Sequence, residues 1–170
     1  LARMDLATVP SKLPKKDVDA VRASVVAGAD TYLAWQEAEA FGHAYPGQAD
    51  GSYEWGGSNS AVLNNQVVLG TAYDLTGDPP RYARAVLESM DYLLGRNALN
   101  NSYITGYGTQ YSSHQHSRWL VPPLPGTISG GPNSQRGTWD PVMNRLYPAG
   151  HECAPQMCYV DDIERGRSTS

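Results

Sequence analysis

Apolar side chains recur every three or four residues through much of the first hundred positions, a spacing that predicts three helices. We expect these helices over 17–39, with Asp17 as the N-terminal cap, over 60–75 and over 81–95. Their buried stripes comprise Val18, Val21, Val25, Ala29, Tyr32 and Leu33, then Val62, Gln66, Leu69 and Tyr73, then Tyr82, Val86, Met90 and Leu93. Gly77 suits a helix C-terminus, and short turns between long amphipathic helices indicate an antiparallel helical array.

From residue 96 onward neither a helical nor a strand period is sustained, because Gly, Pro, Asn and Ser interrupt the chain every few residues. An irregular stretch of this length is unusual in a compact domain unless it builds a functional surface. We therefore expect a helical scaffold over about 17–96, loops that form one face of a site over about 97–164, and an atypical tail over 165–170.

Composition and charge narrow the classes of function. The 170 residues include 13 Lys and Arg and 17 Asp and Glu, which give a formal net charge of −4, and they contain no basic run. This balance argues against nucleic-acid binding, and no apolar stretch approaches the ~18 residues of a membrane span. The first residues lack the basic start and apolar run of a signal peptide, and we expect the chain to be part of something longer.

The aromatic residues are strongly biased, with eleven Tyr and four Trp against one Phe. Tyr and Trp combine a flat apolar face with a polar edge, which suits stacking on sugar rings and hydrogen bonding to hydroxyl groups. Packing under long loops would explain the same bias. Trp55, in a Gly-rich stretch just before the second expected helix, has the same two interpretations: it stacks on a ligand, or it covers the core where the helix begins.

Two cysteines, Cys153 and Cys158, lie five positions apart in a loop-like stretch. An oxidised pair would close a small loop and indicate an extracellular or periplasmic compartment. Two free thiols in a cytosolic protein are the alternative. A zinc site is disfavoured, since only His151 lies close and no second Cys pair exists.

Two histidines and an arginine, His114, His116 and Arg118, follow the Gly-flanked aromatic turn over 102–108. A His-x-His pair in an extended segment could ligate a metal from one face. Loop histidines that bond to backbone groups are the interpretation we favour over a metal. Recognition of hydroxyl or carboxylate groups is the third, because Arg offers a planar fork of donors.

Three carboxylates, Asp161, Asp162 and Glu164, stand within four positions near the end of the chain. Neighbouring carboxylates raise one another's affinity for protons, which is how acid and base sites are tuned. A helix start or a pair of calcium ligands would account for the same residues.

Considered together, these segments resemble the family 9 glycoside hydrolases, the inverting cellulases. The resemblance rests on the order and spacing of the motifs over most of the chain from about Val9 onward, and on a Trp-Gly-x-Ser-Asn motif that carries one extra Gly at Gly57. The other segments are 90–97, 102–108, the His-x-Arg motif at 116–118, 125–126, 130–133 and the Tyr-x-Asp-Asp motif at 159–162.

The resemblance implies an all-α fold, a partial (α/α)6 barrel with long ordered loops and an open cleft for a β-1,4-glucan. It implies that His116 and Asp161 are catalytic-site residues. It also implies that Trp55, Arg118 and Tyr159 bind the substrate. Inversion requires two carboxyl groups ~6.5–9.5 Å apart, one acting as acid and one as base.

Two departures from the family pattern accompany these matches. The motif Asp-Ala-Gly-Asp, which carries the family's base, is absent from the sequence. The proton-donor Glu is expected nine residues after Asp161, with an aromatic residue four positions before it, but Ser170 and Gly166 occupy those positions. The resemblance implies that the chemistry requires no cofactor. The family's calcium ligands lie upstream of the matching region, so a structural calcium is an expectation for the missing part of the domain, and no metal ligand is assigned to this chain.

We therefore expect residues 1–170 to be the C-terminal portion of the catalytic domain of a secreted bacterial enzyme that hydrolyses cellulose or another β-1,4-glucan. The pair Cys153–Cys158 is similar to that of secreted actinobacterial members, which implies a disulfide. The expected partners are the glucan and the missing half of the barrel. The alternative is a catalytically inert glucan-binding fragment, which lacks both the base and the proton donor.

Overall fold

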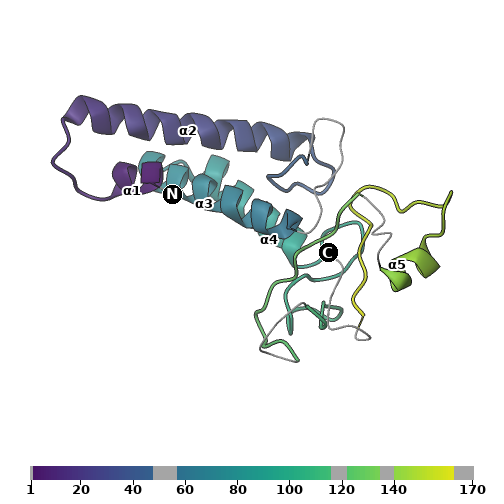
Figure 1. The fold of residues 1–170 in the computed structure, drawn as a ribbon. Helices are drawn as coiled ribbons and strands as arrows, with labels where there is room; N and C mark the ends of the chain where they lie inside the picture. The colour runs from purple at the N-terminus through teal and green to yellow at the C-terminus, as the bar shows by residue number, and fades with distance from the viewer. Residues whose placement is uncertain (1, 48–56, 116–121, 135–139, 163–170) are drawn as a thin grey trace. The chain divides into compact units, whose positions relative to one another are not determined.

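The computed structural model describes residues 2–47, 57–115, 122–134 and 140–162. Within these ranges the regular elements are helices, and there is no strand, only isolated bridges between extended segments (Figure 1). None of the helices in the described residues combines the length and apolar character needed to cross a membrane.

The chain divides into two compact units. Unit 1 comprises Leu1–Tyr45 and Val62–Met90, and unit 2 comprises Pro46–Ala61 and Asp91–Ser170. The described elements are α1 (Ala2–Thr8), α2 (Lys15–Ala38), α3 (Ser58–Thr76), the single π-helical turn η1 (Pro79–Ala83), α4 (Arg84–Leu93) and α5 (Pro141–Leu146).

The three predicted helices are confirmed as α2, α3 and the pair η1–α4, with small changes at their ends. The expected cap of the first helix was wrong: Pro14 occupies the N-cap position, and Asp17 lies within the first turn. Proline is well suited to that place, because its fixed φ is compatible with the start of a helix. Gly77 does end α3 as predicted, since it adopts φ 64° and its N–H donates to the carbonyl of Tyr73 at 2.8 Å.

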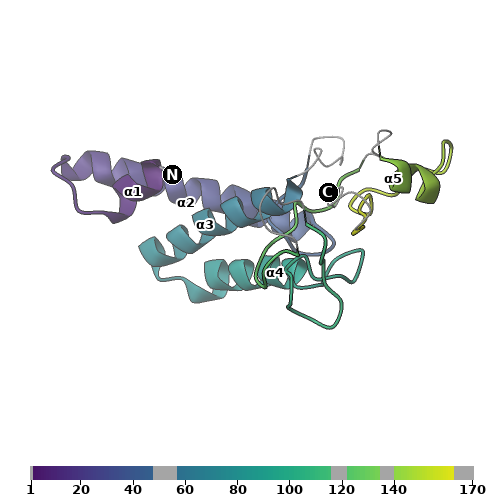
Figure 2. The same ribbon diagram turned by 60° about the horizontal axis from the view of Figure 1, so that its bottom comes forward.

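Unit 1 has a core of small and aromatic side chains. α2 lies alongside α3 and α4 in both ribbon views (Figure 2). Several buried side chains of unit 1 are alanines, and two hydrogen bonds join its helices: Tyr82 Oη donates to Asp30 Oδ1 at 2.6 Å, and Gln66 Nε2 donates to the carbonyl of Val86 at 3.0 Å. The buried cluster consists of Ala29, Ala44, Leu69, Ala72, Tyr82 and Ala85.

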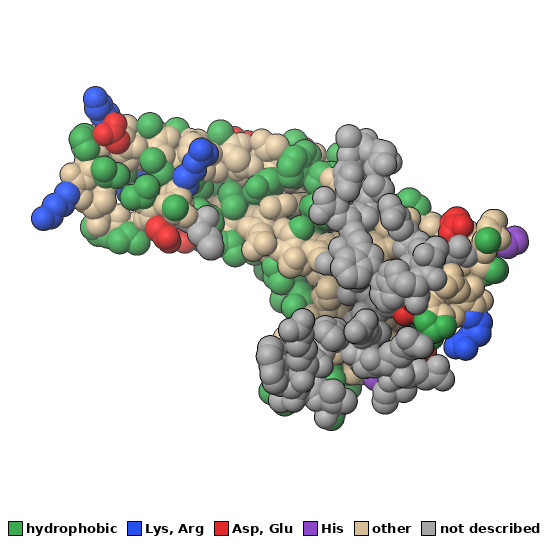
Figure 3. All heavy atoms as spheres, in the orientation of Figure 1, with side chains coloured by type: hydrophobic (Ala, Val, Ile, Leu, Met, Phe, Trp, Pro, Cys, Tyr) green, Lys and Arg blue, Asp and Glu red, His purple; other side chains and the backbone are tan. Residues whose placement is uncertain are grey.

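Several apolar side chains of unit 1 nevertheless lie at the surface, where hydrophobic side chains are visible along the helices (Figure 3). Val67 of α3 is 53% exposed and Leu87 of α4 is 65% exposed. Apolar side chains exposed on neighbouring helices are typical of a surface that packs on another part of a protein. They agree with the expectation of further barrel helices, which stays a prediction.

Candidate functional site

The framework of unit 2 is a set of extended segments held by backbone hydrogen bonds. The segment 102–105 lies between two others: its residues Ser102 and Thr105 bond to 110–112 and 126–127, respectively. Ser112 N donates to the carbonyl of Ser102 at 2.8 Å, and Thr105 N donates to that of Thr127 at 2.9 Å. The Gly-flanked aromatic turn identified in the sequence is therefore the centre of this framework.

The start of α3 is fastened to the loop at 129–132. Asn59 N donates to the carbonyl of Gly130 and Asn59 Nδ2 to that of Ser129, both at 3.0 Å, while Ser58 Oγ donates to the carbonyl of Pro132 at 2.7 Å. Gly131 makes this approach possible. It adopts φ 104°, and a Cβ atom at this position would lie 2.4 Å from Ser58 Oγ.

Sequence reasoning assigned no function to Ser58, Asn59 or Gly131, although two of the family motifs include them. The signal that could have found them is the pairing of a Gly-Gly-Pro segment with a Ser-Asn pair at a helix start. Trp55, the predicted stacking residue, precedes this helix start by three positions and lies outside the described residues.

Tyr159, a predicted substrate-binding residue, is buried in the described structure. Its ring contacts that of Tyr103 edge-on at 5.6 Å between centroids, and Tyr103 in turn packs on Tyr92 at 5.8 Å. Its hydroxyl lies 2.6 Å from Ser112 Oγ, and burial raises the pKa of Tyr159 to about 12. Its phenol thus stays neutral at ordinary pH and joins the motif at 159–162 to the central segments; contact with substrate stays a prediction.

Asp161, a predicted catalytic-site residue, lies against the segment that leads to the His-x-Arg motif. Its Oδ2 accepts hydrogen bonds from Ser113 N at 2.7 Å and Ser113 Oγ at 3.1 Å, and its Oδ1 accepts one from His114 N at 2.7 Å. The Nδ1 atom of His114 is 3.4 Å from Oδ2. The structure therefore brings together two of the constellations noted in the sequence, the paired histidines and the carboxylates.

Gln115 fastens the other side of the same segment. Its buried Nε2 donates to the carbonyl of Ser112 at 2.9 Å and to Thr105 Oγ1. The hydroxyl of Thr105 donates to the same Ser112 carbonyl at 3.0 Å. Sequence reasoning treated Gln115 only as the spacer between two histidines, because nothing local distinguishes a buried amide from an exposed one.

The disulfide between Cys153 and Cys158 is confirmed, with 5.3 Å between the two Cα atoms. Cys158 also exchanges two backbone hydrogen bonds with Asn133, at 3.2 and 3.3 Å. Met143 of α5 packs against the disulfide. These contacts fix the residue that immediately precedes Tyr159.

Helix α5 was not predicted, although its signals are readable. Asp140 Oδ1 accepts from Val142 N at 2.7 Å and from Met143 N at 2.9 Å, and Pro141 occupies the first turn. Aspartate at the N-cap followed by proline is a recognised helix start. The helix is too short for its apolar residues to show a period.

The described residues do not test the two remaining predicted site residues or the metal interpretation. His116 and Arg118 lie outside them, as does Trp55. Among the residues that are described, no three His, Cys, Asp or Glu side chains are grouped so as to hold a metal ion. The His-x-His pair is not part of that finding, because one of its members is not described.

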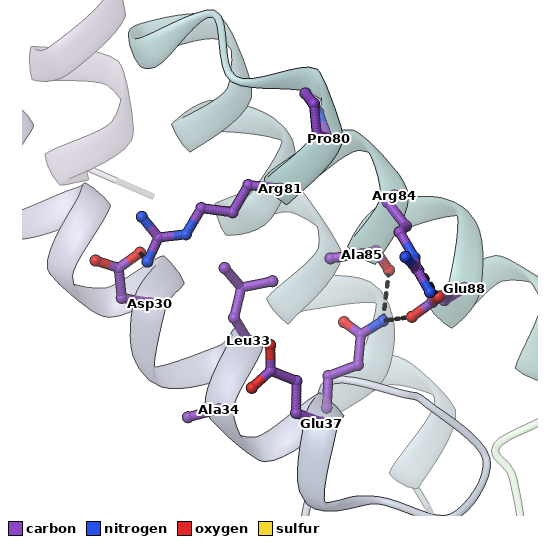
Figure 4. A pocket seen from close by; sticks show the side chains of 10 residues that line it. Asp30, Leu33, Ala34, Glu37, Pro80, Arg81, Arg84, Ala85 and Glu88 are labelled. Atoms are coloured by element: carbon purple, nitrogen blue, oxygen red, sulfur yellow. Dashed lines mark hydrogen bonds and ion pairs between the residues drawn. The ribbon is translucent and has the colours of Figure 1, made fainter.

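A concave region lies within unit 1, where η1 and α4 face α2 (Figure 4). Its volume is about 560 Å³, and both of its arginines are engaged in ion pairs. Arg81 Nη2 lies 2.8 Å from Asp30 Oδ1, and Arg84 Nε donates to Glu88 Oε1 at 2.8 Å. Because both cations of this groove are already paired with carboxylates, we assign no catalytic role to it.

Comparison with known proteins gives a consistent set of relatives. The family model described as Glycosyl hydrolase family 9 matches residues 2–169. Endoglucanase C of Cellulomonas fimi is 54% identical over 174 residues, which cover 96% of this chain and 15% of that protein. Cellulose 1,4-beta-cellobiosidase of Acetivibrio thermocellus is 38% identical, with 96% of this chain and 19% of that protein covered.

Solved structures agree with these relatives. A Zn-binding triple mutant of the GH family 9 endoglucanase J30 superimposes with a TM-score of 0.80 at 28% identity. The match covers 98% of this chain and 30% of that one. The chain thus spans less than a third of this structure and less than a fifth of either curated relative.

Proposed function

Because the chain belongs to glycosyl hydrolase family 9, we propose that a full-length enzyme containing it hydrolyses β-1,4-glucosidic bonds in cellulose. The observation that carries the proposal is the family match over residues 2–169. The names of the relatives support the same substrate, since one is an endoglucanase and another a cellulose 1,4-beta-cellobiosidase. The expected all-α fold, part of an (α/α)6 barrel, is confirmed by the helical structure and its family 9 neighbours.

The proposed reaction inverts the configuration of the anomeric carbon. One carboxylic acid protonates the leaving oxygen, while a carboxylate on the opposite face of the sugar removes a proton from the attacking water. We assign neither group to this chain, whose sequence has no Asp-Ala-Gly-Asp motif and has Ser170 at the position expected for the proton donor. This chain would contribute one side of the cleft.

The residues proposed to act on the sugar belong to two motifs. Trp55 would stack on a glucosyl ring, and His116 and Arg118 would hydrogen-bond to ring hydroxyls and hold a distorted sugar ring. Hydrogen bonds to a distorted sugar ring strengthen in the transition state, so they increase the turnover number more than the affinity for the substrate. The hydrogen-bonded segments 102–105 and 110–112 precede His116 and Arg118 in the sequence, the second of them by only a few positions.

The mode of action is proposed to be internal cleavage, as the name of the Cellulomonas fimi relative indicates for that protein. Release of cellobiose from chain ends is the second candidate, favoured by the name of the Acetivibrio thermocellus relative. Both relatives align over 96% of this chain, so these residues alone do not separate the two modes.

The experiment is a time course of soluble cellulose with the full-length enzyme. We expect a rapid fall in viscosity, products of mixed length and α-anomer in the earliest product as observed by NMR. Cellobiose as the sole early product would indicate action from chain ends. An initial β-anomer would contradict inversion, and absence of any product would contradict the proposed substrate.

For the 170-residue chain alone, we propose that it is catalytically inert and that it retains at most weak affinity for glucan. This second candidate rests on the missing Asp-Ala-Gly-Asp motif and on Ser170. The purified chain is expected to give no turnover of soluble cellulose above a buffer control. Measurable turnover would show that both catalytic groups are present after all.

Secretion is part of the proposal. The bond between Cys153 and Cys158 supports it, because disulfides persist in oxidising compartments and are rare in the bacterial cytosol. Titration of the freshly secreted, unreduced and unfolded protein should find no free thiol from these two residues. Two free thiols would contradict this part of the proposal.

A further inference from the structure

We propose that Asp161 is a positioning residue: it holds the backbone of Ser113 and His114 and thereby directs the chain that continues into the His-x-Arg motif. This inference rests on the proposed function, because the role of that motif in hydrolysis is itself proposed. It assigns to Asp161 a different task from that of a group that exchanges a proton with the substrate.

The contacts of the carboxylate carry the inference. Both of its oxygens are engaged, Oδ1 by His114 N at 2.7 Å and Oδ2 by Ser113 N at 2.7 Å and Ser113 Oγ at 3.1 Å. Hydrogen bonds between an ionised carboxylate and backbone N–H groups are stronger than neutral ones. The two oxygens of a carboxylate lie in one rigid plane. Because two consecutive backbone N–H groups bind to them, the direction of the chain at Ser113 and His114 is restricted.

The same geometry opposes proton transfer by Asp161. An ionised carboxylate only accepts hydrogen bonds, whereas a protonated one has an O–H that must itself donate. Oδ2 already accepts from Ser113 N and Ser113 Oγ, so a proton on that oxygen would displace one of these donors. A carboxylate that gained and lost a proton at Oδ2 in each turnover would have to break one of these contacts each time.

The carboxylate is itself held in place from the preceding residues. Tyr159 is buried against Tyr103, with its hydroxyl 2.6 Å from Ser112 Oγ. Cys158 is tied by the disulfide and by its backbone pairing with Asn133. Asp161 therefore connects a fixed frame to the segment at 113–114, and His116 follows that segment by two positions.

The first test compares Asp161→Asn with wild type in the full-length enzyme. Asparagine retains the shape but replaces one acceptor oxygen by an NH₂ group, which would face a backbone N–H. We expect kcat to fall on the order of a hundredfold, the effect of a misplaced catalytic constellation, while both limbs of the pH–rate profile keep their positions. Loss or displacement of a limb, or an unchanged kcat, would overturn the inference.

A double-mutant cycle separates positioning from a general structural role. If Asp161 acts through the His-x-Arg segment, Asp161→Asn in a His116→Ala background should reduce kcat less than threefold further. Multiplicative losses would overturn the inference. Asp91→Asn is the matched control, because this aspartate is exposed in the same unit, and it should leave kcat within twofold of wild type.

Hydrogen exchange provides a readout that does not depend on activity. The backbone amides of Ser113 and His114 lie outside any helix. In the wild-type enzyme we expect them to exchange about as slowly as the amide of Ser102, which donates to the carbonyl of Gln110. Asp161→Asn should accelerate exchange at these two amides at least tenfold, with no change in α2. Unprotected amides in wild type would overturn the inference even if the variant failed to fold.

The two hypotheses fail in different ways. An enzyme without activity on cellulose would contradict the proposed function. Slow exchange of the Ser113 and His114 amides, accelerated by Asp161→Asn, would still support the positioning role. Normal activity with rapid exchange at these amides would contradict only the positioning role.

Discussion

The interior of unit 1 and the interior of unit 2 are stabilised by different interactions. Unit 1 is a helical packing in which Ala29, Leu69 and Ala85 are removed from water, and its backbone hydrogen bonds are mostly local to each helix. In unit 2 the backbone is largely irregular, and its order comes from hydrogen bonds between distant residues, such as Ser58 to Pro132 and Asp161 to Ser113. A loop-rich region can be well ordered when polar groups, rather than an apolar stripe, determine its path.

The difference has a functional consequence. Helix packing tolerates exchange of one apolar side chain for another of similar volume, whereas a hydrogen-bonded loop depends on particular donors and acceptors. All the proposed site residues belong to unit 2. We therefore expect substitutions in unit 1 to change stability alone and those in unit 2 to change stability and activity together.

The largest expected effect is that of Gly131→Ala in unit 2. The new Cβ would lie 2.4 Å from Ser58 Oγ in a backbone of φ 104°, so strain and overpacking together should reduce the free energy of unfolding by about 4 kcal/mol. Urea unfolding of the full-length enzyme measures it. Gly126→Ala is the matched control, because Gly126 has φ 87° but a Cβ added there would meet no atom within 4 Å, and equal losses would contradict the clash.

Leu69→Ala tests the apolar core of unit 1. Leu69 is fully buried, and removing its side chain should reduce the free energy of unfolding by about 3 kcal/mol while kcat of the folded enzyme stays unchanged. The comparison variant is Leu87→Ala, whose side chain is 65% exposed here. A loss below about 0.5 kcal/mol is expected if that surface meets water, and a larger one if further helices cover it.

Replacing both Cys153 and Cys158 by serine should have a smaller effect. The chain-entropy relation gives a reduction of roughly 2 kcal/mol in the free energy of unfolding for so short a loop. Hydrogen exchange should accelerate at the amide of Asn133, which bonds to Cys158, and should not change in α2. Faster exchange throughout unit 1 would contradict the expectation that the disulfide stabilises unit 2 alone.

The smallest expected effect is that of Tyr159→Phe, which removes one hydroxyl contact worth about 1 kcal/mol. Burial raises the pKa of Tyr159 to about 12, above the value of about 10 for an unfolded chain. The neutral phenol therefore stabilises the fold below pH 10, and this contribution is lost as pH rises from about 10 to about 12. In the variant, the free energy of unfolding should fall less steeply over that interval; identical slopes would contradict the assignment.

The helices could be predicted because the residues that determine them lie close together in the sequence. The stripe of Val25, Ala29 and Leu33 repeats at the helical period, and Gly77 marks the end of α3 within one residue of the expected position. Errors occurred where that period is absent or ambiguous. The cap at Asp17 was misplaced because this helix begins directly after Pro14 without any side-chain cap, and α5 is too short to display a stripe.

The site was predicted in part. Order and spacing of the motifs identified the family and the segment that contains Asp161, and the disulfide followed from the resemblance. What Asp161 contacts was not accessible, because Ser113 and Asp161 are 48 positions apart. The same holds for Gln115 and Gly131, whose importance depends on which distant groups surround them.

The sequence by itself thus determined the three long helices, the family and the group of motifs that carry the proposed chemistry, because each is written in residue types at fixed local spacing. Only the tertiary structure decided that Tyr159 is buried on Tyr103, that Gly131 must lack a side chain beside Ser58, and that Asp161 binds the backbone before the His-x-Arg motif. The physical reason is that a hydrogen bond or a close approach is a property of two positions at once. In an irregular region no period relates those positions along the chain.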